Sequence, residues 1–489
     1  MLGGPDDITP HRVLILLLFV GLLCIGVMAI FPANGISFGG EYKLRFKTLS
    51  SLLDTTKNGG SIDGNLSDFL MQYDSIPTLA ETKADSLNVV RTTNTASLQF
   101  ADDRAEILYP FFEKLESAKT AGDILHVLHY GDSQIETDRI TGFIRAEMQK
   151  KFGGKGPGLI PPVPITESAN ISQSKSSNWK RYTAYGFQDS KSAHNKYGVM
   201  ASFGRFTAAK AKELINPLDS ISAWLEFKPS YMAQSSARIY SKATMLAGNN
   251  LFDVRVDVFA DDSLIDTKIL SASSFMSTHT WHFSSTPGVL RFQFIGADSP
   301  DVHAICLEGE SGIMVDNIAL RGSSGNIFTK INGSEIRTAY EFLNPGLIIM
   351  QFGGNTVPFL KTSESAKDYG NFFQSQIRYL KSQCPDAVFI VIGPSDMSTK
   401  IDGEYQTWPF LEDVRDALKT AAFAEKCAFW DIYAIMGGRN SMISWVENSP
   451  PFAAPDYTHF TPKGARKVAE IFYHSLMSEY DAWYKAKLE

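Results

Sequence analysis

The chain has 489 residues, a length that predicts more than one compact core. Its 46 Lys and Arg residues against 53 Asp and Glu residues leave a net charge of −7, which excludes a protein that binds nucleic acid mainly by neutralising phosphates. Hydrophobic residues make up 44% and charged residues 20%, so the composition excludes both a disordered chain and a polytopic membrane protein.

The first feature along the chain is an uncharged run of 19 residues, VLILLLFVGLLCIGVMAIF, at 13–31, behind a short tail at 1–12. As a helix it would be about 28 Å long, enough to cross a bilayer core. We expect a transmembrane anchor, with a long signal peptide cleaved near Ala29 as the alternative. Either reading predicts a membrane-anchored or secreted protein whose working part lies outside the cytoplasm, in the periplasm or cell envelope. Residues 32–100, rich in Ser, Thr, Asn and Gly, are interpreted as a spacer.

Regular patterns begin near residue 101. Apolar residues at helical spacing over 107–115 precede a buried strand, ILHVLHY at 124–130, which ends in Gly131-Asp132-Ser133. A helix over 140–148 follows, up to a glycine-rich breaker at 153–158. Between 160 and 312 the period changes to two, as in Val254, Val256 and Val258, and this predicts an all-β sandwich.

Strands and helices alternate again after residue 325. Strands are predicted at 347–352, 387–393 and 427–432, with helices at 365–382 and 410–425 and a last helix from Pro462. This order predicts a mostly parallel sheet covered by helices. The predicted fold class is therefore α/β, with one discontinuous domain formed by 101–159 and 313–489 and interrupted by an all-β domain at 160–312.

Three loops at expected strand ends carry side chains of complementary chemistry. Ser133 follows the first strand, Asn355 follows the strand at 347–352, and Asp456 and His459 precede the last helix. A serine hydroxyl can be deprotonated by a histidine that a carboxylate orients, and an asparagine amide can donate to an oxyanion. Each residue alone is uninformative, but the set in this order indicates nucleophilic catalysis.

At these residues the chain resembles the SGNH (GDSL-like) hydrolase superfamily. Four motifs match in order: HYGDSQ at 129–134, RGSSG at 321–325, FGGNT at 352–356 and DYTHFTPKG at 456–464. The resemblance implies a three-layer sandwich fold, a catalytic triad and an oxyanion hole made by two amides and one side chain. The implied triad is Ser133, His459 and Asp456, and the implied oxyanion donors are Ser133, Gly325 and Asn355. Gln134 and Thr356 depart from the usual pattern without touching a triad role.

The long interruption between the first two motifs resembles the peptidoglycan O-acetylesterase group, in which a β domain similar to a carbohydrate-binding module is inserted at that point. This implies an exported serine esterase that removes O-acetyl groups from a cell-wall or related polysaccharide and needs no cofactor. An O-acetyltransferase using the same triad and a glycan-binding protein without turnover stay open as alternatives. The sequence leaves the glycan open, because it identifies no glycan-contacting residue. A net charge of −7 is too mild to disfavour an anionic glycan.

Other residues are weaker candidates. Asp396, Arg439 and Asn440 lie near predicted strand or helix ends and are expected in the substrate cleft, although a turn-capping role is equally reasonable for Asp396. His126 and His129 should point to opposite faces of their strand, so hydrogen bonds or packing are expected rather than a shared metal. The scattered Cys306, Cys384 and Cys427 suggest no metal site either, and Trp224 and Trp281 are candidate glycan contacts in the β domain.

Overall fold

The computed structural model describes residues 96–186, 192–208 and 215–489, together with the short strands β1 (Ile36–Ser37) and β2 (Lys43–Leu44). The chain divides into two compact units, Met1–Ile76 and Pro77–Glu489, and β1 pairs antiparallel with β2 in the first. The apolar segment predicted at 13–31 and most of the predicted spacer lie outside the described residues. In the part of the chain that the structure describes, no helix is long and apolar enough to cross a bilayer.

A five-stranded, entirely parallel sheet forms the centre of the second unit. Its strands are, in spatial order, β15 (Gly312–Ala319), β3 (Ile124–Gly131), β16 (Pro345–Gln351), β17 (Val388–Ile392) and β20 (Ala428–Trp430). Four of these strands, β3, β16, β17 and β20, confirm predictions from the sequence. They were predictable because a parallel strand buried on both faces is an almost continuous apolar run. The edge strand β15 was missed, since Asp316 and Asn317 interrupt its apolar run.

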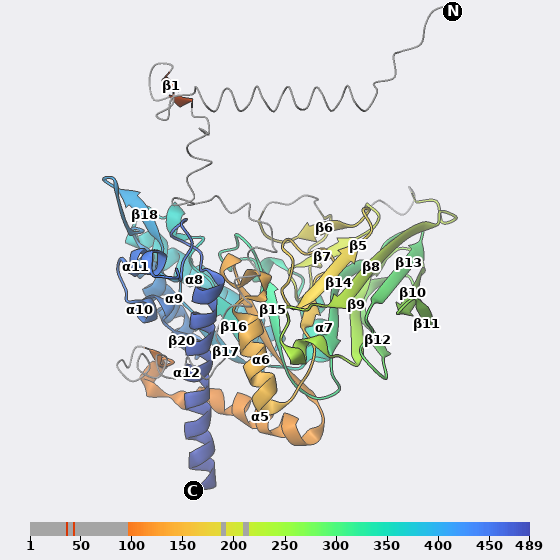
Figure 1. Ribbon diagram of the computed structural model, residues 1–489, viewed down its shortest axis with the longest axis horizontal. Helices are drawn as coiled ribbons and strands as arrows, with labels where there is room; N and C mark the ends of the chain where they lie inside the picture. The colour runs from red at the N-terminus through yellow and green to blue at the C-terminus, as the bar shows by residue number, and fades with distance from the viewer. Residues whose placement is uncertain (1–35, 38–42, 45–95, 187–191, 209–214) are drawn as a thin grey trace, which may run out of the picture. The chain divides into compact units, whose positions relative to one another are not determined.

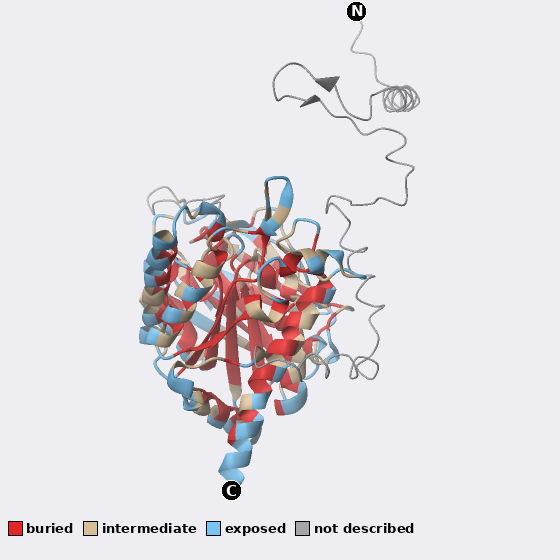
Figure 2. Cartoon of the chain, turned by 90° about the vertical axis from the view of Figure 1, so that its left-hand side faces the viewer, coloured by how far each residue is buried: buried red, intermediate tan, exposed pale blue. Residues whose placement is uncertain are grey.

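Helices cover both faces of the parallel sheet, which makes three layers. Side chains that alternate along each strand enter two separate cores: Leu125 and Val127 of β3 belong to one, and Leu128 and Tyr130 to the other. The first core is completed by α5 (Tyr109–Ala121), α6 (Thr141–Phe152) and α12 (Pro462–Leu488), and the second by α7 (Gly333–Leu343), α8 (Ser363–Gln383) and α9 (Leu411–Ala424). Figure 1 shows α5, α6 and α12 in front of the strands. Figure 2 shows that the central strands are buried and that the helices around them expose their outward sides.

The segment between β3 and β15 contains two antiparallel sheets. One has the order β11 (Ser263–Leu270), β10 (Val254–Ala260), β13 (Leu290–Gly296), β8 (Ile221–Pro229) and β5 (Ile171–Lys175). The other has the order β12 (Ser273–His282), β9 (Lys242–Asn250), β14 (Asp301–Glu308), β7 (Ser202–Arg205) and β6 (Lys180–Thr183), with β4 (Gly158–Ile160) beside β14. Alternate residues of both sheets, such as Val256 and Met245, share one buried core, so the two sheets pack face to face.

Shorter elements complete the described part of the second unit. The hairpin of β18 (Ser398–Ile401) and β19 (Glu404–Thr407) follows β17, and the short helices α10 (Ile432–Met436) and α11 (Ser441–Glu447) follow β20. The 3₁₀ turns are η2 (Ala101–Asp103), η3 (Ala105–Leu108), η4 (Ser133–Asp138), η6 (Ser235–Arg238), η7 (Phe328–Lys330) and η8 (Val357–Phe359).

A buried charged cluster joins the sandwich to the parallel sheet. His126 on β3 places Nδ1 2.7 Å from Asp316 Oδ2 on β15 and Nε2 3.2 Å from Glu308 Oε2 on β14. Burial opposes a charge on this imidazole, but the charge of Asp316 and hydrogen bonds to both carboxylates outweigh it and raise the pKa of His126 to about 10. His126 is therefore protonated at neutral pH and bridges the two parts of the fold.

The two histidines of β3 point to opposite faces, as predicted. His129 lies 3.0 Å from both Gln351 Oε1 and Thr141 Oγ1, and burial lowers its pKa to about 4. The ligand-type atoms of His126, Cys306 and Glu308 lie within 4.8 Å of one another. Both nitrogens of the protonated His126 ring donate hydrogen bonds to carboxylates, so neither has a lone pair for a metal ion. With His126 protonated, His126, Asp316 and Glu308 form an ion-pair cluster.

Candidate active site

The nucleophile candidate stands where the first parallel strand turns into a helical turn. β3 ends at Gly131, and the Asp132 carboxylate accepts a hydrogen bond from the Gln134 N–H at 2.9 Å, which caps η4. Ser133 is therefore the first residue of η4, and its half-buried side chain faces a cavity. The position gives the hydroxyl access to solvent while its backbone is held by the cap.

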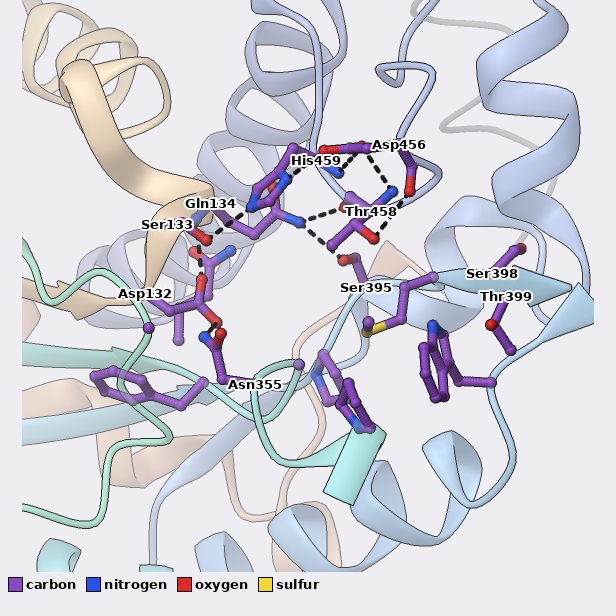
Figure 3. Close-up of a pocket in the computed structure, with 18 of the residues that line it drawn as sticks. Asp132, Ser133, Gln134, Asn355, Ser395, Ser398, Thr399, Asp456, Thr458 and His459 are labelled. Atoms are coloured by element: carbon purple, nitrogen blue, oxygen red, sulfur yellow. Dashed lines mark hydrogen bonds and ion pairs between the residues drawn. The ribbon is translucent and has the colours of Figure 1, made fainter. Parts of the chain in front are cut away.

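The structure brings the three predicted triad residues together in one hydrogen-bonded line (Figure 3). Ser133 Oγ lies 2.8 Å from His459 Nε2, and His459 Nδ1 lies 2.7 Å from Asp456 Oδ2. The other carboxylate oxygen, Oδ1, accepts hydrogen bonds from the backbone N–H groups of Thr458 and His459, both at 3.0 Å. The orientation of Asp456 is thus fixed by its own loop, and the carboxylate in turn fixes the imidazole.

Electrostatics keep the Asp456 carboxylate ionised. Burial opposes its ionisation, but hydrogen bonds from the His459 ring and from the backbone N–H groups of His459 and Thr458 outweigh burial and lower the pKa of Asp456 to about 2. An ionised Asp456 holds a proton on His459 Nδ1, which leaves Nε2 free to accept the proton of Ser133.

Asn355 follows β16 and lies beside the nucleophile loop. Its Nδ2 donates to Asp132 Oδ2 at 3.1 Å and to the Ser323 carbonyl at 3.2 Å, so the amide is held with its donor group next to Ser133. Burial raises the pKa of Asp132 to about 6, although the Gln134 N–H and the charges of His459 and Arg139 oppose the rise. Asp132 therefore positions Asn355 rather than belonging to the triad.

The structure does not bring Gly325 to the cavity that Ser133 faces. Its N–H donates to Ser323 Oγ at 3.1 Å, and a Cβ at this position would lie 2.7 Å from the Phe352 ring. Together with a φ of +73°, this makes Gly325 a packing requirement of the loop. Gly322, three residues earlier in the same motif, lines the cavity instead.

Two polar side chains to which the sequence analysis gave no role in the site, Gln134 and Arg139, hold the nucleophile loop against the histidine loop. Gln134 donates through Nε2 to the Thr458 carbonyl at 2.7 Å and accepts the Phe460 N–H at 3.3 Å. Arg139 donates to the carbonyls of Phe460 at 3.0 Å and Ser133 at 2.5 Å. Gln134 departs from the usual motif, and that departure was the only available signal of its role.

The three residues predicted in the substrate cleft lie outside the cavity lining, and two of them, Asp396 and Asn440, bond to the same residue, Thr407. Asp396 is fully buried and accepts hydrogen bonds from Thr407 Oγ1 at 2.8 Å and the Met442 N–H at 2.8 Å, so it anchors β19 to α11. Asn440 Oδ1 accepts the Thr407 N–H at 2.8 Å, and Arg439 pairs with Glu412 at the surface. The strand-end positions were recognised, but the direction of the side chains depends on β19, which was not predicted.

The candidate glycan-contacting tryptophans of the sandwich differ in exposure. Trp281 is 4% exposed and packs against Phe292 in the sandwich core, with ring centroids 5.1 Å apart. Trp224 is half-buried on the outer face of its sheet, beneath the Arg291 guanidinium at 5.3 Å.

The cavity in front of Ser133 has a volume of about 760 Å³. Loops at the carboxyl ends of β15, β3, β16 and β17 line it, together with the β18–β19 hairpin and the Asp456–His459 loop. This volume lies within the range of sites that bind small organic ligands. Its rim carries Phe359, of which 81% is exposed.

Comparisons with known proteins bear on the fold. Neither a protein-family model nor a curated protein matches the chain. A solved structure described as a peptidoglycan O-acetylesterase in action superposes with a TM-score of 0.60 at 19% identity, covering 76% of this chain and 96% of that one. A family two carbohydrate esterase from Clostridium thermocellum in complex with cellohexaose is 10% identical, with a TM-score of 0.24, and the match covers 58% of this chain and 98% of that one. A family two carbohydrate esterase from Cellvibrio japonicus is also 10% identical, with a TM-score of 0.23, and the match covers 64% of this chain and 99% of that one.

The first of these structures is matched over 96% of its own length. The superposition shows that the chain is similar in fold to this peptidoglycan O-acetylesterase structure.

Proposed function

We propose that the protein is a serine esterase that removes O-acetyl groups from a cell-wall or related polysaccharide. One observation carries the proposal: a continuous line of hydrogen bonds runs from Asp456 through His459 to Ser133, and Ser133 faces a cavity of ligand size. A serine held only for structure needs neither the imidazole nor the cavity.

The reaction follows from the geometry. Ser133 Oγ attacks the acetyl carbonyl carbon while its proton moves to His459 Nε2, and the charge of Asp456 stabilises the resulting imidazolium. The tetrahedral intermediate expels the sugar oxygen, which takes the proton from His459. Water, deprotonated by the same imidazole, then attacks the acetyl-enzyme, and acetate leaves with regeneration of the Ser133 hydroxyl.

The negative oxygen of each tetrahedral intermediate needs donors beside Ser133. We assign the Ser133 N–H and the Asn355 amide, which exchanges its hydrogen bond to the Ser323 carbonyl for one to the oxyanion when the intermediate forms. Gly322 replaces Gly325 as the neighbouring backbone, because Gly322 lines the cavity and Gly325 does not. Each donor in such a site contributes about 3 to 4 kcal/mol to the barrier reduction.

The substrate and location belong to the proposal as well. The likeness in fold to a peptidoglycan O-acetylesterase supports an acetylated glycan as substrate. The apolar run at 13–31 supports an anchored or secreted protein that works outside the cytoplasm. The sandwich between β3 and β15 is proposed to act as a carbohydrate-binding module.

The test is release of acetate by wild type and Ser133→Ala from acetylated peptidoglycan and acetylated xylan. We expect Ser133→Ala to lose activity at least about 10³-fold while it stays folded, and Ser382→Ala, an exposed serine on α8, to keep wild-type activity. Full activity of Ser133→Ala would refute the assignment. If more acetylated acceptor than free acetate is formed, the result favours a transferase. If mass spectrometry of the wild-type protein detects no acetyl group on Ser133 and no acetate is released, the result favours a glycan-binding protein without turnover.

A further inference from the structure

The β18–β19 hairpin is built against the loop that carries the catalytic histidine. The Ser398 N–H donates to the Tyr457 carbonyl at 2.9 Å, and the rings of Tyr405 and Tyr457 stack with centroids 3.6 Å apart at an interplanar angle of 14°. Tyr457 immediately follows Asp456 in the chain. The hairpin therefore forms a cavity wall whose position relative to the triad is fixed by both backbone and side-chain contacts.

This wall holds a buried hydroxyl without a partner. Ser398 is 5% exposed and lines the cavity, and its Oγ has no hydrogen-bond partner among the described residues. Leaving a buried polar group unsatisfied costs about 1 to 3 kcal/mol, so a ligand oxygen that reaches Ser398 Oγ from the cavity would be bound favourably. In Figure 3, Ser398 and Thr399 lie across the cavity from Asp132 and Asn355.

The same strand presents a cation without a counter-ion. Lys400 lines the cavity and is paired across the hairpin with Tyr405, and its ammonium lies 5.2 Å above the Tyr405 ring. Residues 398 and 400 share one face of β18 because strand side chains alternate. No carboxylate forms an ion pair with Lys400 in the described residues.

The carboxylates of the cavity lining are already engaged. Asp456 is bonded to the catalytic histidine, and Asp132 to the amide of Asn355. A second cation, Arg321, follows β15 at the edge of the parallel sheet and contacts Glu136 only at 3.6 Å. By the order of the strands, Arg321 and Lys400 stand on either side of the loops that carry Ser133 and Asn355.

We propose that the hairpin forms a subsite for a sugar that carries a carboxylate, with Lys400 pairing to the carboxylate and Ser398 Oγ bonding a neighbouring oxygen of the same sugar. The substrate would thus be an O-acetylated acidic glycan rather than a neutral one. This inference rests on the proposed function, since it names the substrate class of the same cavity. The negative charge of the chain as a whole does not contradict it, because the charges that decide binding are local.

The test compares two small substrates that differ in one group: an O-acetylated methyl glucuronoside and its carboxamide. For wild type at low salt, we expect kcat/KM for the acid to exceed that for the amide by about two- to fivefold, the contribution of one exposed charged pair. The preference should shrink as the salt concentration rises. Lys400→Gln should abolish it and Lys400→Arg should retain it, whereas Lys367→Gln, an exposed lysine on α8, should leave it unchanged.

Ser398→Ala should weaken acid and amide alike, by about threefold, without changing their ratio. Equal use of the two substrates by wild type at low salt, or a preference that survives in Lys400→Gln, would overturn the inference.

Failure of the proposed function is recognised separately. Binding of the two sugars to the Ser133→Ala protein, measured by calorimetry, reports the charge preference without any turnover. If wild type releases no acetate from any ester while Ser133→Ala still binds the acid more tightly than the amide through Lys400, the esterase proposal fails and the subsite stands. If the acetyl ester is cleaved through Ser133 but neither measurement shows a charge preference, the subsite fails and the esterase stands.

Discussion

Replacement of Asp456 by asparagine isolates the role of the carboxylate in the triad. The backbone N–H groups of Thr458 and His459 both donate to Oδ1 at 3.0 Å, so an asparagine keeps its carbonyl oxygen there and turns its NH₂ group toward His459 Nδ1. Turning the amide over would lose two hydrogen bonds, about 2 kcal/mol, which leaves roughly 3% of molecules in that orientation.

The tautomer of the imidazole then changes. An amide NH₂ beside Nδ1 requires that nitrogen to be an acceptor, so the ring proton moves to Nε2, which can no longer accept the proton of Ser133. The loop geometry is kept. The misplaced proton lowers the activity about 30-fold, since roughly 3% of molecules keep the productive tautomer, and loss of the carboxylate charge that stabilises the imidazolium lowers it further. We expect kcat/KM to fall by about 10³- to 10⁴-fold, equivalent to about 4 to 5.5 kcal/mol of barrier.

The assay is hydrolysis of 4-nitrophenyl acetate by wild type and Asp456→Asn, with the midpoint of thermal unfolding measured on the same samples. Asp262→Asn is the matched control, because Asp262 is exposed in the β10–β11 turn at a φ of +66°, where asparagine is tolerated. An Asp456→Asn enzyme within about tenfold of wild type would refute the argument that this carboxylate sets the tautomer.

Three further outcomes are expected. Gly325→Ala should lower the free energy of unfolding by about 2 kcal/mol, because the new Cβ would lie 2.7 Å from an aromatic ring. Gly322→Ala should lower it by only about 1 kcal/mol, because the space around that Cβ is open. Equal urea midpoints for the two variants would contradict this. His126→Gln should cost about 3 kcal/mol. In wild type, the stability from charged His126 is full below its unfolded pKa near 6.5 and is lost as pH rises through about 10, so the urea midpoint should fall between pH 7 and pH 10 in wild type and stay flat in the variant. Phe359→Ala should raise KM for the acetylated polymer about fivefold relative to the small ester, since its exposed ring can stack on a sugar; an equal change for both substrates would argue against that contact.

Local sequence patterns were sufficient for four of the five strands of the parallel sheet, all except β15. Continuous apolar runs such as 124–130 and 347–352 have few alternatives to a strand buried on both faces, and the residues at their ends follow from the same reading. The residues of the triad were identifiable because serine, histidine and aspartate at strand ends match a known order of motifs. The structure then brought Ser133, Asp456 and His459 into hydrogen-bonding distance.

The tertiary structure decided which neighbours of these residues face the cavity. Gly322 and Gly325 differ little in sequence context, yet only the first lines the cavity, because the second is packed against Phe352, which follows β16, and Phe373 of α8. Asp396 and Asn440 turn away from the cavity because they bond to Thr407 in β19, a strand too short and polar to be predicted.

The sequence by itself predicted the proposed chemistry, since the types and order of the candidate triad side chains are local properties of three loops. Only the tertiary structure decided the surroundings of that chemistry: the hairpin that places Ser398 and Lys400 beside the triad, and the ion pairs of His126 that join the sandwich to the sheet. These contacts link residues distant in the chain, and their direction depends on register and packing, which no short stretch of sequence encodes.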